Sequence, residues 1–223
     1  MAQDSPPQTS RRGTGPIAAP AGPSDAPIVA FDFDGTLTVR DSFTAFLKWR
    51  AGIAPFALGL ARLAPSAAAY LIHKDRGRIK AAAARTFLRG LARSDLEAEA
   101  EAFAAARWAR FMRPDALETW QTWRGRPVRL LIVSASPSFV VAPFAARLGA
   151  DELIATELAY DAQSRAAGGF ATPNCRGPEK VARLRARFGP EMRLQAAYGD
   201  TAGDREMLQI AETQGYRMFT GRP

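Results

Sequence analysis

The sequence contains one cysteine, Cys175, and one histidine, His73. A single cysteine excludes an internal disulfide, and such cysteine usage is typical of a reducing compartment. Both counts also argue against a zinc site built from cysteine and histidine. We therefore expect a cytoplasmic protein, in which any bound metal ion is held by oxygen ligands.

The sequence also lacks an unbroken apolar run of membrane-spanning length. Residues 52–72 come closest, but Arg62 lies near their centre, and Pro55 and Pro65 interrupt them. A central arginine costs roughly 2.5–3.5 kcal/mol on insertion scales. We therefore expect buried or membrane-surface helices here rather than a span. The basic residues nearby would suit peripheral contact with an anionic membrane, so the protein could be membrane-associated.

No periodic apolar pattern is found in residues 1–26, which are rich in Pro, Gly, Ser and Ala. This composition predicts a disordered leader. Arg11 and Arg12 are not followed by an apolar stretch. The leader therefore lacks the pattern of a secretory or twin-arginine signal.

Positive charge is concentrated in one part of the chain. The net charge is +8, and residues 40–126 hold 16 Lys/Arg against 8 Asp/Glu, whereas the remaining chain has 14 of each. A basic surface attracts phosphates, anionic lipid or nucleic acid, although a solvated arginine-rich surface explains the same composition. The chain has no recognisable nucleic-acid-binding module, so we expect no nucleic-acid partner. The oligomeric state stays open.

Two carboxylates follow the first apolar run of the chain. Residues 28–38 read IVAFDFDGTLT, in which a predicted buried strand leads into Asp32, Asp34 and Gly35. Side chains two residues apart lie on the same side of a strand, so Asp32 and Asp34 are expected to crowd at its carboxyl end. Such a pair requires a metal ion, a shared proton or both, although Asp-Gly alone is an ordinary turn signal.

The remaining pattern predicts an α/β fold with a doubly wound, mostly parallel sheet. From Ser42 to about Trp123 the spacing is helical, and from Val128 onward strands alternate with helices. We expect strands at 128–133, 154–158, 194–198 and 216–219, and a hairpin or excursion over 160–170. Residues 27–39 and 127–223 would form the core domain, and residues 40–126 a helical cap inserted between the first and second strands. Trp108, Trp120 and Trp123 are expected to pack within the cap.

Four further polar residues lie at or near the carboxyl ends of the predicted strands. Ser134 and Asp200 each follow an apolar strand, Asp204 comes four residues after Asp200, and Lys180 begins a predicted helix. Taken singly, each has an ordinary structural role, as a helix cap, a turn residue or a surface lysine. Sites in open α/β sheets form at this edge, so the set also predicts an active site.

In this order, the segments FDFDGTLT, LLIVSAS, GPEKVARL and YGDTAGD resemble the four motifs of haloacid dehalogenase (HAD) superfamily phosphatases. The cap position is similar to that of subfamily IB, the phosphoserine-phosphatase-like group. A closer resemblance, to phosphatidylglycerophosphatase C-like proteins, rests on FDFDGTLTVRDSF, NCRGPEKVARL, the apolar cap stretch and the ending YRMFTGRP. Phosphoserine-specific members usually have Gly-Gly after the second-motif serine, where this chain has Ala135 and Ser136.

The resemblance implies an aspartyl-phosphate mechanism. Asp32 would be the nucleophile, and Asp34 would be the general acid and base. Mg²⁺ would be held by Asp32, the backbone carbonyl of Asp34, and Asp200.

The remaining motif residues would support this chemistry. Asp204 would support the metal site or orient Lys180. Ser134 and Lys180 would bind the substrate phosphate.

Three interpretations follow for the function. The protein could hydrolyse a phosphomonoester on a lipid, such as phosphatidylglycerophosphate, or a small soluble one, such as phosphoserine. It could instead be a non-catalytic protein whose basic cap docks on membrane or nucleic acid. A response-regulator-like receiver also uses a phosphorylated aspartate, but it needs neither an acid at the position of Asp34 nor a long insertion.

Overall fold

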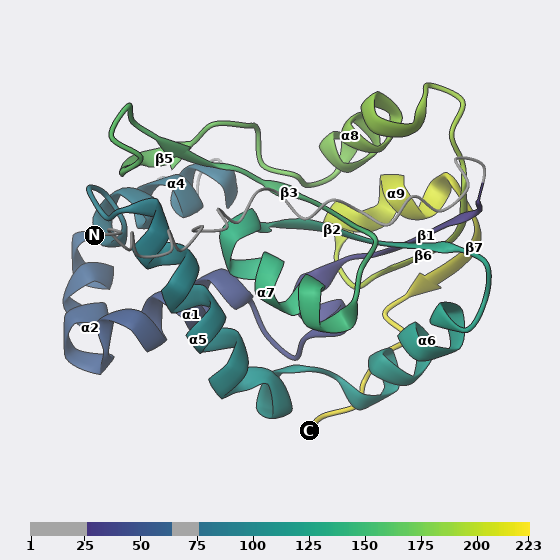
Figure 1. Cartoon of the computed structure of the whole chain (residues 1–223), viewed down its shortest axis with the longest axis horizontal. Helices are drawn as coiled ribbons and strands as arrows, with labels where there is room; N and C mark the ends of the chain where they lie inside the picture. The colour runs from purple at the N-terminus through teal and green to yellow at the C-terminus, as the bar shows by residue number, and fades with distance from the viewer. Residues whose placement is uncertain (1–25, 64–75) are drawn as a thin grey trace, which may run out of the picture.

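The structure, a computed structural model, describes residues 26–63 and 76–223. Its centre is a sheet of five parallel strands in the order β3-β2-β1-β6-β7 (Figure 1). These strands are β1 (Ile28–Phe31), β2 (Arg129–Pro137), β3 (Glu152–Thr156), β6 (Leu194–Gly199) and β7 (Ala211–Tyr216). Strands β4 (Leu158–Tyr160) and β5 (Ala166–Phe170) form a separate antiparallel hairpin at the position of the expected excursion. The predicted α/β class with a parallel sheet is confirmed.

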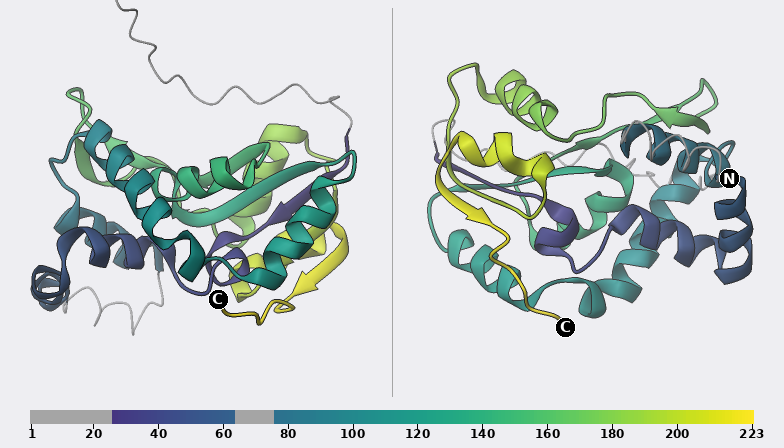
Figure 2. Two further views of the ribbon diagram at one scale, coloured as in Figure 1. Left: turned by 60° about the horizontal axis from the view of Figure 1, so that its bottom comes forward. Right: turned by 180° about the vertical axis from the view of Figure 1, so that it is seen from behind.

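Helices cover both faces of the sheet (Figure 2). The helices of the described residues are α1 (Ser42–Ala51), α2 (Ile53–Arg62), α4 (Arg76–Phe87), α5 (Arg93–Phe111), α6 (Pro114–Arg124), α7 (Ser138–Leu148), α8 (Pro178–Phe188) and α9 (Arg205–Gln209), with short turns η1 (Phe33–Leu37) and η2 (Ala202–Asp204). Along β1, Val29 and Phe31 belong to the core that includes residues of α5, α6 and α7, whereas Ala30 belongs to the core formed with α8 and α9. This alternation is expected for a central strand buried on both faces.

Helix α6 packs beneath the sheet and not within a separate cap. Trp120 packs against Phe31 with ring centroids 5.0 Å apart, and its indole N–H donates to the carbonyl of Leu148 at 3.1 Å. The indole N–H of Trp123 donates to the hydroxyl of Tyr198 on β6 at 2.7 Å. The expectation that these tryptophans pack within the cap is therefore wrong. Trp108 on α5 likewise stacks on a core helix, against Phe144 of α7. Large aromatic rings bury most area against the broad face of the sheet.

Helices α1, α2 and α4 gather at one end of the molecule with the β4–β5 hairpin (Figure 1, left). Aromatic rings join them to one another and to α5. Phe56 of α2 stacks on Phe87 of α4 at 5.5 Å, and Phe46 of α1 meets Phe103 of α5 edge-on at 5.7 Å. We call α1, α2 and α4 the cap helices.

The last strand lies earlier in the chain than expected. Residues 216–219 were expected to close the sheet, but β7 covers Ala211–Tyr216 and pairs with β6. Its residues Glu212, Thr213 and Gln214 are exposed. Because successive side chains alternate, these three exposed residues place polar groups on both faces of the edge strand, so its sequence lacked an apolar signal. Phe219 instead packs under the sheet, 5.5 Å from the ring of Tyr198.

Part of the expected apolar cap stretch is a short helix, since α2 covers Ile53–Arg62. Residues 64–72 of this stretch, including Pro65, lie outside the described residues, as do His73 and the leader up to residue 25. Among the described residues, no helix has the length and apolar character to cross a bilayer.

Candidate active site

Asp32 occupies the end of the central strand. It directly follows β1, and its backbone N–H donates to the carbonyl of Tyr198 on β6 at 2.8 Å, which continues the pairing of the two strands. Its side chain is only 6% exposed, and the hydroxyl of Thr36 donates to its Oδ2 at 3.2 Å. Sheet pairing and burial therefore fix this carboxylate at the carboxyl edge of the sheet, as the sequence predicted.

Lys180 connects two of the carboxylates. Its Nζ lies 2.6 Å from Oδ1 of Asp32, 2.7 Å from Oδ1 of Asp204 and 2.6 Å from the carbonyl oxygen of Val133, and its side chain is 1% exposed. An ammonium group has three N–H donors, and here each has an acceptor. Burial opposes the charged form, but Asp32 and Asp204 together raise the pKa of Lys180. To bind a phosphate oxygen directly, Lys180 would have to exchange one of these partners.

Asp32, Asp200 and Asp204 form an acidic cluster. Each offers a carboxylate oxygen, and these oxygens lie within 4.8 Å of one another. Both oxygens of Asp204 have donors, because Lys180 contacts Oδ1 and the Thr201 N–H and hydroxyl donate to Oδ2 at 2.9 and 2.8 Å. The buried Oδ1 of Asp200 has no hydrogen-bond partner among the described residues. An orphaned carboxylate oxygen beside two other carboxylates fits a divalent cation.

The electrostatics of the cluster agree with a cation site. Burial raises the pKa of Asp32 to about 7 against the opposing charge of Lys180. Burial, followed by the charge of Asp204, raises the pKa of Asp200. Burial acts on Asp204 in the same direction, but Lys180 and the Thr201 donors hold its pKa below the ordinary value. One lysine therefore compensates part of the negative charge, and a bound cation would compensate more.

Glycine is required at the turn after Asp34. Gly35 has φ = +85°, a conformation that L side chains rarely adopt. A Cβ at this position would lie 2.2 Å from Oδ2 of Asp200. The turn therefore brings the backbone of the first motif directly against the fourth motif.

Asp34 has a different environment from Asp32. The backbone N–H of Ser42, at the start of α1, donates to its Oδ1 at 2.7 Å, and the hydroxyl of Ser136 donates to its Oδ2. Burial, and after it the charge of Asp41, raises the pKa of Asp34. Asp34 thus lies between the core and the first cap helix, where burial favours its protonated form.

The second-motif serine does not reach the cavity. Ser134 is fully buried, and its hydroxyl oxygen accepts the N–H of Ser136 at 3.1 Å. Ala135 is the residue of this strand end that lines the cavity. Pro137 occupies the position before α7, with no side-chain cap, and Ser136 contacts Asp34.

A cavity of about 350 Å³ opens beside the carboxylates. Besides Lys180, four cationic side chains line it together with the acidic residues, namely Arg40, Lys80, Arg113 and Arg176. The ammonium of Lys80, on α4, lies 3.3 Å from both the carbonyl of Ala135 and the hydroxyl of Ser136. The Nε of Arg113 donates to the carbonyls of Gly35 and Thr38 at 3.1 and 3.2 Å. The cavity therefore holds both an acidic floor and basic groups able to bind anions.

Sequence reasoning did not single out Lys80, Arg113, Arg176 or Ser136 for the site. The first two come from the segment whose excess of basic residues was noted, but no spacing marked them. Arg176 precedes Lys180 by four residues, and its guanidinium donates to the Thr201 hydroxyl at 3.1 Å. Only the replacement of Gly-Gly by Ala135-Ser136 was a signal for Ser136.

Comparisons with known proteins agree with this geometry. Residues 29–209 match the model of the haloacid dehalogenase-like hydrolase family. The chain is 54% identical over 196 residues to Protein CicA of Caulobacter vibrioides, and the aligned region covers 88% of each chain. A protein of unknown function from Bordetella pertussis Tohama I superposes with a TM-score of 0.68 at 21% identity, over 82% of this chain and 85% of that one. A substrate-bound phosphoserine phosphatase superposes with a TM-score of 0.58 at 18% identity, over 86% of each chain. At these identities the two structures show the fold alone.

Proposed function

This chain belongs to the haloacid dehalogenase-like hydrolase family, and we propose that it is a Mg²⁺-dependent phosphomonoesterase acting through an aspartyl-phosphate. The family predicted from the four motifs is confirmed, and with it an enzyme of the hydrolase class. One observation carries the proposal. Asp32 and Asp34 lie at one cavity, but Asp32 is held by Lys180 and Thr36, whereas Asp34 accepts from Ser136 and Ser42. Two carboxylates in different environments can divide nucleophilic and acid-base work.

In the first step, a carboxylate oxygen of Asp32 attacks the phosphorus atom. The bond between Asp32 and phosphorus forms, and the bond from phosphorus to the leaving oxygen breaks. Asp34 gives its proton to the leaving alkoxide. In the second step, Asp34 takes a proton from a water molecule, whose oxygen attacks the phosphorus atom and releases Asp32 with inorganic phosphate. The raised pKa of Asp34 suits it to hold the proton that the first step needs.

The residues present fit a magnesium ion. Asp32, Asp200 and the backbone carbonyl of Asp34 would hold it, and the unpartnered Oδ1 of Asp200 supports this ligand set. When bound, the ion neutralises negative charge on the phosphoryl group. Asp204 positions Lys180 through their 2.7 Å contact. Lys180 is proposed as a phosphate ligand that exchanges one of its present partners, and Ser134 as one that turns its hydroxyl toward the cavity, which it does not line in this structure.

For the substrate, we propose a phosphomonoester that carries a second anionic group on a lipid, such as phosphatidylglycerophosphate. Besides Lys180, which lies beside the nucleophile, four cations line the cavity, so a second anionic group of the substrate has basic partners available. A small soluble ester such as phosphoserine is the alternative. Ser136 supports the lipid proposal indirectly, because it fills the place where phosphoserine-specific members usually have glycine.

A phosphate-release assay tests the reaction. The wild-type protein should release phosphate from a monoester with Mg²⁺ and not in EDTA. Asp32→Asn should abolish turnover. With an aryl monoester, whose phenolate leaves without a proton, Asp34→Asn should retain phosphate on the protein as a hydroxylamine-labile phosphoenzyme. Asp95→Asn changes an exposed aspartate of α5 that does not line the cavity, and it should be fully active. Equal release by wild type and Asp32→Asn would refute the mechanism.

The choice of substrate needs a second comparison. Phosphatidylglycerophosphate in liposomes and phosphoserine in solution are assayed at matched phosphate concentration. Turnover of phosphoserine with no release from the lipid would refute the lipid proposal and leave the mechanism intact. A folded protein that releases phosphate from no monoester, and binds anionic surfaces, would instead favour the non-catalytic docking function.

A further inference from the structure

Helix α2 presents an apolar face to solvent. Phe56 and Gly59 face α4, where Phe56 stacks on Phe87 and a Cβ on Gly59 would collide with the Phe87 ring. The other residues of α2 are exposed, and all of them except Arg62 are apolar or alanine. Ile53, Leu58 and Leu60 are 79%, 58% and 48% exposed. Three large aliphatic side chains exposed on one short helix are unusual for a free surface and mark a contact site.

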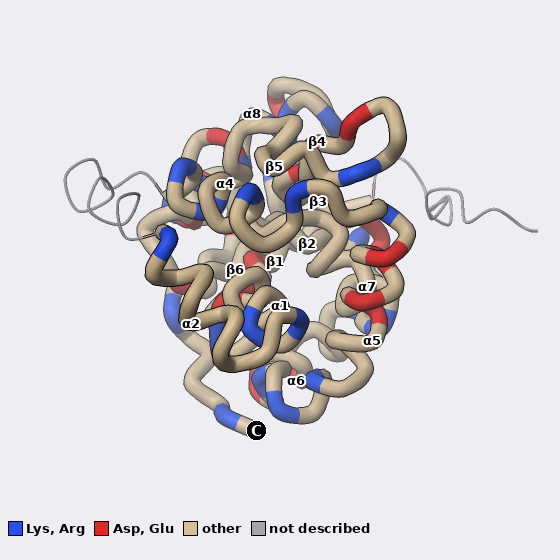
Figure 3. Tube along the Cα trace, turned by 90° about the vertical axis from the view of Figure 1, so that its left-hand side faces the viewer, with Lys and Arg blue, Asp and Glu red and all other residues tan. Residues whose placement is uncertain are grey.

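The cap helices carry positive charge and no negative charge. Helices α1, α2 and α4 contain seven Lys/Arg residues and no Asp or Glu. Lys48, Arg62 and Arg85 are among the exposed ones. Figure 3 looks onto this end of the molecule and shows blue segments on all three helices. A surface with this charge attracts an anionic partner.

This end of the molecule is also where the cavity opens. The carboxyl ends of β1, β2 and β6 point toward the cap helices (Figures 1 and 3). Helix α1 begins at Ser42, whose N–H binds Asp34, and α4 supplies Lys80 to the cavity. A partner that contacts the cap helices therefore lies near the groups proposed to act on the substrate.

We infer that α2, with the basic residues of α1 and α4 around it, docks the protein on an anionic membrane surface. The docking itself does not depend on the proposed phosphatase function; only the use of docking in catalysis rests on it. The transfer of aliphatic side chains into the interfacial region of a membrane is favourable, and Lys and Arg are attracted to anionic headgroups.

The charge and chemistry of this face argue against other occupants. A second copy of the same face would bring the exposed Lys48, Arg62 and Arg85 against their own copies, which disfavours a symmetric dimer. Nucleic acid would match the charge, but the exposed side chains of α2 are aliphatic and offer no stacking surface for bases.

Vesicle co-sedimentation with the full-length protein tests the inference. Wild type is expected to bind vesicles of phosphatidylcholine with phosphatidylglycerol, to bind pure phosphatidylcholine more weakly, and to dissociate with rising salt. The double substitution Leu58→Glu with Leu60→Glu should weaken binding to the anionic vesicles by at least about tenfold. Turnover of a soluble phosphomonoester should be unchanged in this variant, because neither leucine lines the cavity.

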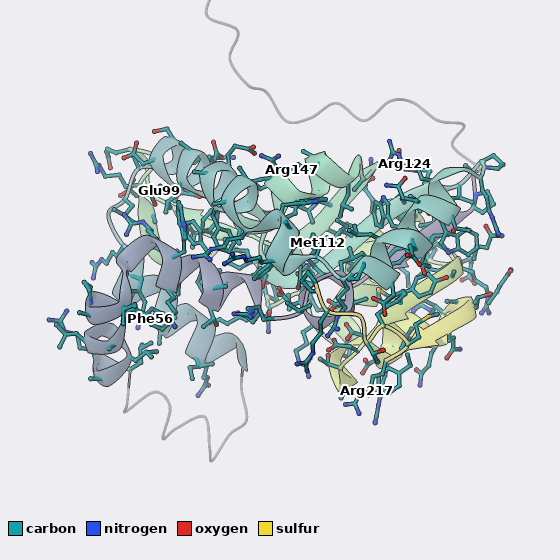
Figure 4. All side chains as sticks on the ribbon, turned by 90° about the horizontal axis from the view of Figure 1, so that it is seen from below. Phe56, Glu99, Met112, Arg124, Arg147 and Arg217 are labelled. Carbon is teal, nitrogen blue, oxygen red and sulfur yellow. The ribbon has the colours of Figure 1, made fainter. Side chains whose placement is uncertain are left out.

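Met218→Glu is the matched control, since Met218 is an exposed apolar side chain at 53%. Its neighbour Arg217 lies on the β7 side of the molecule, away from Phe56 on α2 (Figure 4). This variant should bind vesicles as wild type does. Vesicle binding by the double variant at wild-type strength would overturn the assignment to α2. Equal binding to neutral and anionic vesicles would overturn the proposed role of charge.

Two further outcomes separate this inference from the proposed function. If wild type does not bind vesicles but hydrolyses a soluble monoester, docking is refuted and the phosphatase proposal stands. If wild type binds vesicles through α2 but hydrolyses no monoester, the docking surface stands and the phosphatase proposal fails. Loss of dimers or of nucleic-acid binding in the double variant, without vesicle binding by wild type, would assign the face to those partners instead.

Discussion

Replacing Lys180 by methionine should destabilise the protein strongly. Methionine keeps the length of the side chain but removes the ammonium that contacts Asp32, Asp204 and the carbonyl of Val133. Asp32 and Asp204 are 6% and 2% exposed, so neither gains solvent in compensation. Removing one partner of a buried ion pair costs about 3–5 kcal/mol. Because a domain is stable by only about 5–15 kcal/mol, we expect this variant to lose a large part of its free energy of unfolding.

The loss should depend on pH in a direction set by the two carboxylates. Without the ammonium, the folded-state pKa of Asp32, which burial already raises, should rise further, and that of Asp204 should rise above the unfolded value. A carboxyl group of this kind contributes stability that is present at low pH and is lost as pH rises through its folded-state pKa. The difference between wild type and Lys180→Met should therefore be larger at about pH 8 than at about pH 5.

Urea unfolding followed by circular dichroism measures this prediction. The urea titrations of both proteins are run in the presence of EDTA, so that metal binding does not contribute to the free energy of unfolding. Lys48→Met, at an exposed position of α1, is the control and should change the free energy of unfolding by less than about 0.5 kcal/mol. A loss below about 1 kcal/mol for Lys180→Met, or a loss independent of pH, would refute the buried-pair reasoning.

Three other predictions follow from the geometry. In EDTA, the free energy of unfolding of wild type should fall as pH rises from about 4 to about 7, because burial raises the folded-state pKa of Asp32 to about 7. Calorimetry that shows no such fall across this range would contradict the prediction. Gly35→Ala should lower kcat at least ~100-fold, since its Cβ would lie 2.2 Å from Oδ2 of Asp200 at φ = +85°; a steady-state assay checks this, and near-normal kcat would show that the turn can relax. Asp115→Ala should release the C-terminal tail, because Asp115 Oδ2 accepts the N–H of Gly221 at 2.7 Å; carboxypeptidase sensitivity should rise at a cost of ~1 kcal/mol in stability, and unchanged sensitivity would contradict the tether.

The motif residues could be found from sequence because each follows a local pattern. A buried strand that ends in a polar residue marks the carboxyl edge of the sheet, and parallel strands bring such ends together. Asp32 and Asp200 were placed correctly on this basis, and the structure gathers them with Asp204 and Lys180. The α/β class followed from the same alternation of strands and helices.

Features that depend on long-range packing were missed or misplaced. Strand β7 has no apolar pattern because it lies at the sheet edge, and its position depends on pairing with β6. Trp120 and Trp123 belong to a helical segment whose sequence does not say which surface it packs on. Similarly, Ser134 was expected at the cavity, but its hydroxyl accepts from Ser136 inside the strand end.

The sequence by itself determined the family, the parallel sheet and the acidic residues of the site, because these depend on short segments whose order in the chain dictates their order in space. Only the tertiary structure decided how the site is completed. Lys80 of α4 and Arg113, which lies between α5 and α6, reach the cavity from distant parts of the chain, and Ser136 rather than Ser134 contacts Asp34. The structure also decided that α2 turns its leucines outward. Which face of a helix is buried depends on its neighbours, and no local pattern in an almost wholly apolar helix can specify it.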